Sequence, residues 1–272
     1  MKRVLTIVLA ALMVATMVLG VTSCKTDKKV ISVGYTDYPP MNYLDENNEL
    51  VGFDTELAKA VFTNLGYDEV VFKLIKWENR YTELSSGNVD CLWNGFTANT
   101  ADEDGVLRAD KVDFSYNFME NRQVIVVKAD QIAVLEASSA DKANMLKDKI
   151  GYVEASSAGA GYAEAFEGAI VKEATNQTAA IMQVKSEAAY FAVVDAQLAK
   201  SLAGKGDYTD LAIFDPLSSD VEYYAVGFEK GSELTAQVNA QFEALAADGA
   251  LMRLAEKYEV ATTVITDFSD QK

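Results

Sequence analysis

Short apolar runs of strand length alternate with amphipathic segments along most of the chain. The first run, Val30 to Tyr35, stops at the turn-forming residues Asp37-Tyr38-Pro39-Pro40, so it predicts a buried strand. Apolar residues then recur every four positions from Leu57 to Leu65, which is typical of a helix, with Asp54 as its expected N-terminal cap. The same pattern predicts further strands at 70–75, 89–93, 123–128, 150–153, 170–172, 190–194, 211–214 and 221–228, and helices at 78–86, 157–166, 177–186, 196–202, 233–247 and 251–258.

This alternation of strands and helices predicts an α/β protein whose parallel sheets are covered by helices. It occurs in two blocks, and strand-like stretches near 121–128 and 221–228 join them without a linker rich in Pro, Gly or Ser. Two direct crossovers of this kind indicate a hinge. A cleft between two hinged domains is a favoured place for a ligand.

The N-terminus has the pattern of an export signal. Met1-Lys2-Arg3 is cationic, an apolar run follows as far as Val21, and the chain turns polar after Cys24. An uncleaved membrane helix is the alternative, because the run is close to the minimum length of a membrane span. Val21-Thr22-Ser23-Cys24 resembles the lipobox of bacterial lipoproteins. We therefore expect residues 1–23 to be a lipoprotein signal peptide, Cys24 to carry the lipid, and residues 24–29 to form a lipidated tether.

Composition excludes several classes of function. The chain has 24 Lys and Arg against 41 Asp and Glu, a formal charge of −17, which argues against nucleic acid as a partner. It contains no His, so mechanisms that need an imidazole are excluded. Cys91 lies in an apolar run and is expected to be buried and unreactive. The acidic stretch Asp102-Glu103-Asp104 lacks the EF-hand pattern, so we expect a solvated face there, and no metal or cofactor.

Several stretches, in order and in spacing, resemble the extracellular solute-binding proteins of amino-acid ABC transporters (solute-binding protein family 3). They are Asp37-Tyr-Pro-Pro-Met41, Leu50-Val-Gly-Phe-Asp54, Ser86-Gly-Asn-Val-Asp90, Asn94-Gly-Phe-Thr97, Lys111-Val-Asp-Phe-Ser115, Gln123-Val-Ile-Val-Val127, Tyr190 to Asp195, and Ala246 to Leu251 with Glu256-Lys-Tyr258. The resemblance implies a two-lobe, periplasmic-binding-protein-like α/β fold with two hinge crossovers and the second lobe inserted in the first. It implies lobe 1 at 30–122 and 226–272, and lobe 2 at 123–225 with hinge strands at its ends.

The resemblance also implies a function. Such a protein is a lipid-anchored receptor on the extracellular side of the cell membrane, which is periplasmic if the host has an outer membrane. It captures an amino acid in the cleft between the lobes and delivers it to an ABC transporter permease. We expect a monomer without enzymatic activity. Two other functions stay open: an enzyme of the same fold that resembles cyclohexadienyl dehydratase, and an extracellular ligand sensor.

A free amino acid presents a carboxylate and an ammonium group on one carbon, so its site needs a planar donor such as Arg and a carboxylate. Family members carry the carboxylate at the position of Asp195. This residue follows the apolar run Phe191 to Val194, at the carboxyl end of a predicted strand, where α/β sheets bind ligands. Capping of the helix at 196–202 is its alternative role.

The family's Arg lies five residues after the position of Thr97, and here that position is Asp102. The next Arg is Arg108, and an insertion of roughly Ala101 to Val106 brings it into register. We therefore expect Arg108 to bind the ligand carboxylate from a lengthened loop. Arg80 and Arg122 are the alternatives.

The resemblance implies three further groups of ligand contacts. One group follows a strand and offers backbone groups and a hydroxyl, one precedes a helix whose N-terminus favours a carboxylate, and one walls the side-chain pocket with aromatic rings. The first group has a plain turn as its alternative role. The second has simple helix capping, and the third has a place in the hydrophobic core. The residues are Asn94, Gly95 and Thr97, then Ser156 and Ser157, then Tyr35, Tyr38 and Trp77.

Overall fold

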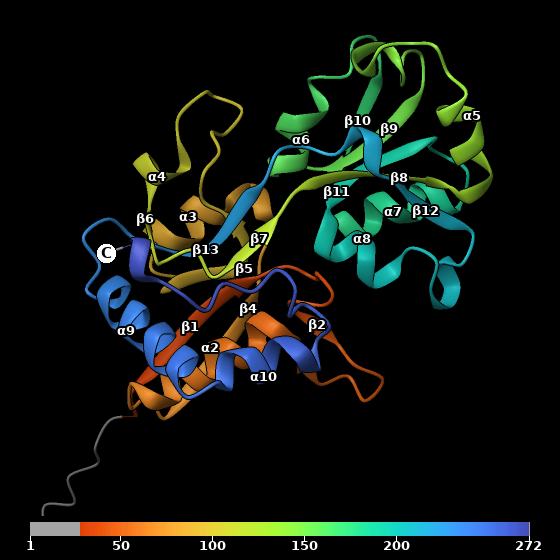
Figure 1. Ribbon diagram of the computed structural model, residues 1–272. Coiled ribbons are helices and arrows are strands. Elements are labelled where there is room, and N and C mark those ends of the chain that lie inside the picture. The colour runs from red at the N-terminus through yellow and green to blue at the C-terminus, as the bar shows by residue number, and fades with distance from the viewer. Residues whose placement is uncertain (1–27, 272) are drawn as a thin grey trace, which may run out of the picture.

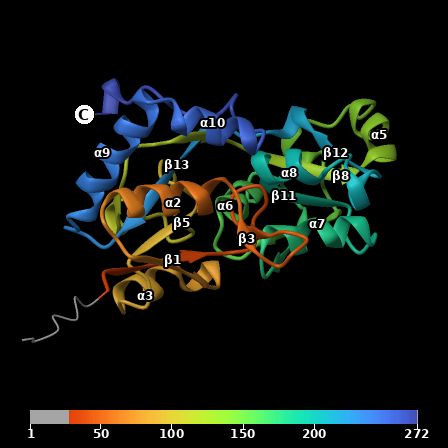
Figure 2. The same ribbon diagram turned by 90° about the horizontal axis from the view of Figure 1, so that it is seen from below.

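The strand-length apolar runs build two separate β-sheets in the computed structural model, which describes residues 28–271 (Figure 1). Helices cover both sheets, so the molecule has two α/β lobes that lie next to each other (Figures 1 and 2). The expected signal peptide at 1–23 and the expected lipidated Cys24 lie outside the described residues, as does most of the 24–29 tether. Within residues 28–271, no helix combines the length and the apolarity that a membrane span needs.

The first sheet has the strand order β4-β1-β5-β13-β6, with β7 also paired to β13. Strands β4, β1 and β5 are parallel, whereas β13 runs antiparallel to β5, β6 and β7. The strands are β1 (Val30–Tyr35), β4 (Glu69–Leu74), β5 (Cys91–Thr97), β6 (Asp113–Phe114), β7 (Met119–Asn121) and β13 (Glu222–Phe228), with the small hairpin β2 (Tyr43–Leu44) and β3 (Leu50–Val51). The helices of this lobe are α2 (Phe53–Asn64), α3 (Arg80–Ser85), α4 (Arg108–Lys111), α9 (Leu234–Ala247) and α10 (Ala250–Lys257).

The second sheet has the order β10-β9-β11-β8-β12, in which β10, β9 and β11 are parallel and β8 is antiparallel to both its neighbours. Its strands are β8 (Gln123–Lys128), β9 (Ile150–Glu154), β10 (Ile170–Ala174), β11 (Phe191–Asp195) and β12 (Leu211–Phe214). Its helices are α5 (Ile132–Glu136), α6 (Ala158–Ala163), α7 (Gln177–Lys185) and α8 (Ala196–Leu202). Short 3₁₀ turns lie at 77–79, 129–131, 142–144, 206–208, 215–217 and 269–271.

Strand β8 explains how the core of the second lobe is built. Its residues are apolar at successive positions, and the two faces of a strand alternate. Val124 and Val126 therefore join the hydrophobic cluster that also fills the first lobe, whereas Ile125 and Val127 join a cluster on the opposite face. Burial on both faces is what the unbroken apolar run predicts for a central strand.

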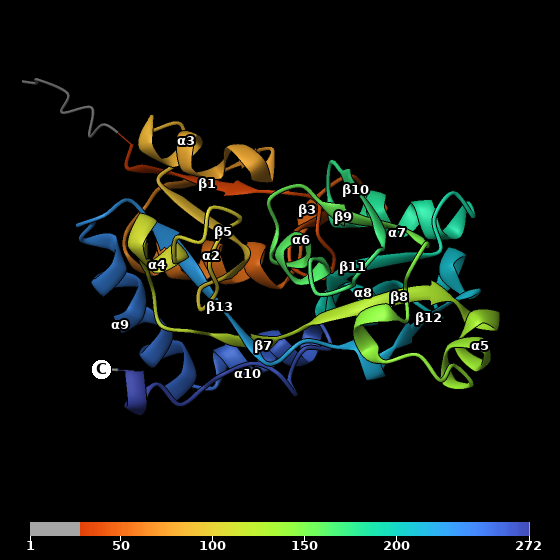
Figure 3. The same ribbon diagram turned by 90° about the horizontal axis from the view of Figure 1, so that it is seen from above.

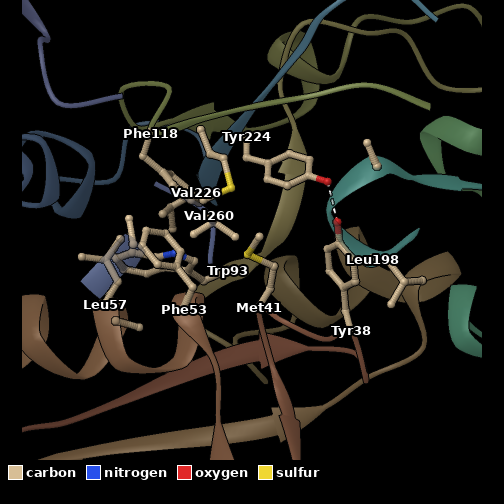
Figure 4. Packing of buried hydrophobic residues seen from close by; sticks show 14 of the residues in the cluster. Tyr38, Met41, Phe53, Leu57, Trp93, Phe118, Leu198, Tyr224, Val226 and Val260 are labelled. Carbon is tan, nitrogen blue, oxygen red and sulfur yellow. Dashed lines mark hydrogen bonds between the residues drawn. The ribbon is translucent and has the colours of Figure 1, made fainter. Parts of the chain in front are cut away.

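The largest hydrophobic cluster extends across both lobes. In the first lobe it packs Trp93, Phe53 and Phe118, none of which exposes any measurable surface (Figure 4). Leu198 of α8 reaches the same cluster from the second lobe, next to Tyr38 (Figure 4). Full burial of one such side chain contributes roughly 1.5–3 kcal/mol to folding, so α8 is held firmly against the first lobe.

The two crossovers between the lobes run side by side in opposite directions (Figure 3). Asn121 of β7 pairs with Glu222 of β13, and backbone and hydroxyl groups of Gln123 and Ser219 exchange hydrogen bonds of 2.9 Å. Strand β13 pairs with the first sheet from Glu222 onwards, four residues before the expected boundary of lobe 1 at residue 226. This paired ribbon is where a change in the angle between the lobes would be absorbed.

Several predicted elements differ from the structure at their ends, and three of the differences matter most here. Asp54 does not cap α2: Gly52 is the N-cap, and Asp54 lies inside the helix, where its buried carboxylate accepts the backbone N–H of Gly95 at 2.8 Å. The strand expected at 89–93 runs from Cys91 to Thr97. The helix expected at 157–166 is limited to Ala158–Ala163.

Candidate ligand-binding cleft

The carboxyl ends of parallel strands from both sheets face one small cavity between the lobes. Strands β1 and β5 of the first lobe and β9 and β11 of the second end beside it, which is where open α/β sheets hold ligands. The cavity measures about 20 Å³, enough for about one water molecule, so an amino acid enters only when the lobes move apart. It is lined by Thr36, Asp37, Tyr38, Trp77, Asn94, Gly95, Thr97 and Arg108 of the first lobe and by Glu154, Ser157, Ala158, Gln177 and Asp195 of the second.

Asp195 is the most completely hydrogen-bonded acidic group of this cavity. Its Oδ1 accepts the side-chain amides of Asn121 at 2.7 Å and Gln123 at 2.5 Å, and its Oδ2 accepts that of Gln177 at 2.6 Å. Its side chain makes no capping hydrogen bond to α8, although Asp195 occupies the N-cap position. The carboxylate is thus fixed by neutral donors and directed at the cavity rather than at the helix that follows it.

Two further acidic side chains, Glu154 and Glu222, lie close to Asp195. Both are buried, at 4% and 7% exposure. Burial raises the pKa of the Glu154 carboxyl to about 8, and the neighbouring charge of Asp195 adds to the rise. Burial and Asp195 likewise raise the pKa of Glu222 to about 7. A positive charge placed among these groups would therefore be strongly favoured.

Arg108 lines the cavity from the first lobe and is 1% exposed. Its Nη1 donates to the backbone oxygen of Thr97 at 3.2 Å, and its Nε donates to Asp102 at 2.8 Å. The same oxygen of Asp102 accepts Arg80 Nη2 at 2.6 Å. Asp102 thus holds two buried guanidinium groups in place, at the position where the resemblance implies an Arg. It does not form the solvated face that the acidic stretch predicts.

The two alternative arginines are placed differently. Arg80 is buried, but its Nη1 donates to the carbonyl oxygen of Trp77 and its guanidinium lies 4.4 Å from the ring centroid of Tyr81. It braces the turn that carries Trp77. Arg122 is exposed beside the hinge. Of the three, Arg108 is the one that lines the cavity.

Tyr38, which lines the cavity, forms a pair with the buried Tyr224, with their hydroxyl oxygens 2.6 Å apart (Figure 4). Gly95 lies against both rings with a φ of +57°, in the left-handed region that favours glycine. A Cβ at this position would lie 2.5 Å from Tyr38 Cε1 and 3.1 Å from Tyr224 Cε2. Gly95 is therefore required both for its conformation and for the close approach of the rings.

We expect Gly95→Ala to lower the melting temperature and to weaken ligand binding, because the added methyl displaces Tyr38 and strains the backbone. Gly87→Ala is the matched control, since Gly87 also has a positive φ, +70°, but nothing lies within 4 Å of the added Cβ. Thermal unfolding and ligand titration of both variants measure the difference. Equal effects of the two changes would mean that contact with the rings plays no part.

The remaining predicted site residues divide between the cavity and its supports. Trp77 lines the cavity, whereas Tyr35 lies outside it and packs edge-on against Phe72 at 6.2 Å between ring centroids. The Asn94 amide is used up in bonds to Thr36 and Asn42, so it braces the end of β1.

The two predicted serines also separate. Ser157 lines the cavity, and its hydroxyl caps α6 by accepting the N–H of Ala160 at 3.1 Å. Ser156 is half-buried, has a φ of 58°, and is not among the lining residues.

Sequence reasoning missed several residues of the site. Glu154 and Gln177 lie at the cavity, and both carry a signal in hindsight: Glu154 is the polar residue directly after an apolar run, and Gln177 begins a helix. Asn121, Gln123 and Glu222 sit on the crossovers, where the sequence indicates only strands. Their polar side chains are buried, which within a strand is itself a sign of a special role.

Two α/β lobes joined by paired crossovers, with polar residues of both facing an enclosed space between them, define a cleft-type solute-binding protein. The model of the bacterial extracellular solute-binding proteins, family 3, matches residues 31–261, and the chain belongs to this family. The family resemblance and the α/β two-lobe fold that the sequence predicts are thereby confirmed.

Individual relatives agree with this assignment. The arginine-binding extracellular protein ArtP of Bacillus subtilis (strain 168) is 26% identical over 85% of this chain and 86% of its own length. An ancestral arginine-binding protein bound to arginine superposes with a TM-score of 0.73 at 29% identity, covering 85% of this chain and 98% of that one. An ancestral amino acid-binding protein described as a precursor of cyclohexadienyl dehydratase gives a TM-score of 0.72 at 28% identity, covering 85% and 95%.

Proposed function

We propose that the protein is a receptor that captures a free α-amino acid between its lobes and delivers it to an ABC transporter permease. The observation that carries the proposal is the opposition of Arg108 on the first lobe and Asp195 on the second across one cavity. Arg108 binds the α-carboxylate, and the two nitrogens already used leave Nη2 for that contact. Asp195, Thr97 and the backbone at Gly95 hold the α-ammonium group.

A ligand held in this way favours the closed form, because each of its two charged groups meets a different lobe. The closed form also has direct contacts between the lobes. The Gln197 side chain of α8 donates to the backbone oxygen of Glu120 and to the hydroxyl of Thr263, both at 2.9 Å, and Lys205 pairs with Glu259 at 3.3 Å. Closure buries the ligand, and the closed outer surface is what a permease recognises.

The anchor completes the proposed role. A lipid on Cys24 would hold the receptor on the outer side of the membrane, near its permease, and two acyl chains make such an attachment stable. Mass spectrometry of the protein extracted from membranes measures the added acyl mass. Cys24→Ala should lack this acyl mass, and the same added mass on the variant would contradict a lipid on Cys24.

A thermal-unfolding panel tests the ligand class. The purified protein is unfolded, freed of carried ligand, refolded, and mixed with the standard amino acids, cystine and small peptides. At a ligand concentration about a hundredfold above the dissociation constant, binding adds roughly 2.7 kcal/mol of stability, which raises the melting temperature by roughly 5–10 °C. A folded protein that responds to none of the α-amino acids would overturn the proposal.

A dehydratase of the same fold is the second candidate. The observation that favours it is Glu154, a buried carboxyl whose raised pKa of about 8 suits a general acid at neutral pH. Incubation with prephenate or arogenate, followed by mass spectrometry of the products, decides the matter. Loss of water and carbon dioxide from either compound, abolished by Glu154→Gln, would establish the enzyme; unchanged substrate rejects it.

A further inference from the structure

Three acidic side chains converge on the second-lobe and hinge side of the cleft: Asp195, Glu154 and Glu222. Gln123 connects two of them, because its amide donates to Asp195 and, at 2.9 Å, to Glu222. All three are buried, and within residues 28–271 none of them forms a salt bridge with a Lys or Arg side chain. A single ammonium group would contact Asp195 and leave Glu154, the other member of this trio that lines the cavity, without a cationic partner.

Glu154 differs from Asp195 in how its oxygens are used. Each oxygen of Asp195 already accepts an amide N–H, so one added cation completes its surroundings. Glu154 is 4% exposed and lines the cavity, and its Oε1 has no hydrogen-bond partner. A buried acceptor left without a donor destabilises the closed protein, and more so when it is charged. A donor from the ligand removes that destabilisation.

The positive side of the cleft does not balance these acids. Arg80 and Arg108 share one oxygen of Asp102, and Lys111 binds its other oxygen at 2.9 Å. Lys111 also pairs with the exposed Asp104 at 2.7 Å. The three cations Arg80, Arg108 and Lys111 exceed the two anions Asp102 and Asp104 by about one positive charge. This surplus matches the α-carboxylate of the ligand. The charges of Arg80 and Arg108 also act on Glu154, but within residues 28–271 neither guanidinium forms an ion pair with it.

A metal ion does not fit the same acids. Across the described residues, no group of three or more His, Cys, Asp or Glu is arranged to hold a metal. The side-chain amides around Asp195 direct N–H groups at its oxygens, and an N–H group has no lone pair with which to coordinate a metal. An organic cation that supplies its own N–H donors suits both Asp195 and the free Oε1 of Glu154.

We propose that the ligand is a basic amino acid, whose side-chain cation is recognised by Glu154 while Asp195 holds its α-ammonium group. This inference rests on the proposed function and specifies its substrate class. The class comprises arginine, lysine, ornithine and shorter diamino acids, each of which brings one anionic and two cationic groups. The carboxylate of such a ligand matches Arg108, its α-ammonium group matches Asp195, and its side-chain cation matches Glu154.

Matched pairs of ligands test the inference. Arginine is compared with citrulline, which has nearly the same shape and a neutral end group, and lysine with norleucine, which lacks the side-chain ammonium. Isothermal titration calorimetry of the wild-type protein should give at least about tenfold tighter binding of the basic member of each pair, as expected for a buried charge-assisted hydrogen bond. Glu154→Gln should remove most of that preference while citrulline still binds.

Glu167→Gln is the control, because Glu167 is an exposed acid of the same lobe that does not line the cavity. This variant should leave unchanged the ratio of the affinities for arginine and citrulline and the ratio of those for lysine and norleucine. Equal or tighter binding of citrulline or norleucine by the wild-type protein overturns the inference but leaves the amino-acid receptor standing. An unchanged preference in Glu154→Gln overturns the role of Glu154. Absence of binding by any α-amino acid to folded protein overturns the proposed function and this inference together. If Glu154→Gln does not fold, the wild-type ratios alone decide.

Discussion

Asp195→Asn should weaken amino-acid binding by about a hundredfold or more, because the α-ammonium group loses its counter-charge inside a closed site. Asn has nearly the shape of Asp, and its oxygen still accepts the amides of Asn121 and Gln123. Its amide nitrogen faces that of Gln177, so one hydrogen bond is lost in addition to the charge. The dissociation constants of the two proteins, measured by calorimetry with the same amino acid, give the effect.

Asp210→Asn is the matched control for this change. Asp210 lies at the far end of the second lobe, where it is bound on the surface to Lys128 at 2.7 Å. Exposed ion pairs contribute about 0–1 kcal/mol to stability, and this one does not touch the cleft. The Asp210→Asn variant should therefore bind the ligand with the affinity of the wild-type protein. Unaltered affinity in Asp195→Asn would show that the ammonium group is held elsewhere.

The sequence was a good guide wherever a local pattern determines the outcome. The stretch from Gln123 to Lys128, with its apolar run Val124 to Val127, predicts a strand, and β8 spans these residues. Asp195 could be picked out because a carboxylate directly after an apolar run comes to the edge of the sheet where ligands bind, and it lines the cavity there. The strand needs only periodicity, whereas the choice of Asp195 also rests on the resemblance to the family, because Glu154 follows an apolar run in the same way.

The sequence was a poor guide where a side chain contacts residues that are far away along the chain. Asp54 has the position of a helix cap, but its carboxylate accepts a hydrogen bond from Gly95, 41 residues later. Glu154 and Gln177 belong to the site because three segments of the second lobe fold together. No local pattern distinguishes these residues from other polar residues at strand or helix ends.

Asp102 shows the same limit. The sequence indicates an insertion ahead of Arg108 but not that Asp102 turns inward. Burial alone would raise the pKa of its carboxyl group, yet the Tyr81 hydroxyl and the charges of Arg80, Lys111 and Arg108 lower it to about 2. The loop that carries Asp102 thus supplies the anion that allows two arginines to be buried beside the cleft.

Asp102→Asn should lower the free energy of unfolding by about 3–5 kcal/mol, because it removes the shared counter-charge of two buried guanidinium groups. Arg80 and Arg108 are 2% and 1% exposed, so water cannot replace the lost carboxylate. Urea unfolding at pH 7 measures the change. Asp104→Asn is the control: Asp104 also binds Lys111, but on the surface, and its loss should cost less than about 1 kcal/mol.

The pH dependence of stability gives an independent check of the same carboxylate. Its pKa is about 2 in the folded protein, below the ordinary value of 3.8, so its ionised form stabilises the fold at every pH above that ordinary value. This contribution is lost as the pH falls from about 4 through about 2, when the unfolded chain binds the proton first. The wild-type protein should therefore lose stability faster than Asp102→Asn over this range, so that the two unfolding curves converge in acid. A constant difference between them from pH 7 to pH 2 would show that Asp102 acts through its shape alone, and that the charge of the two arginines is compensated by other groups.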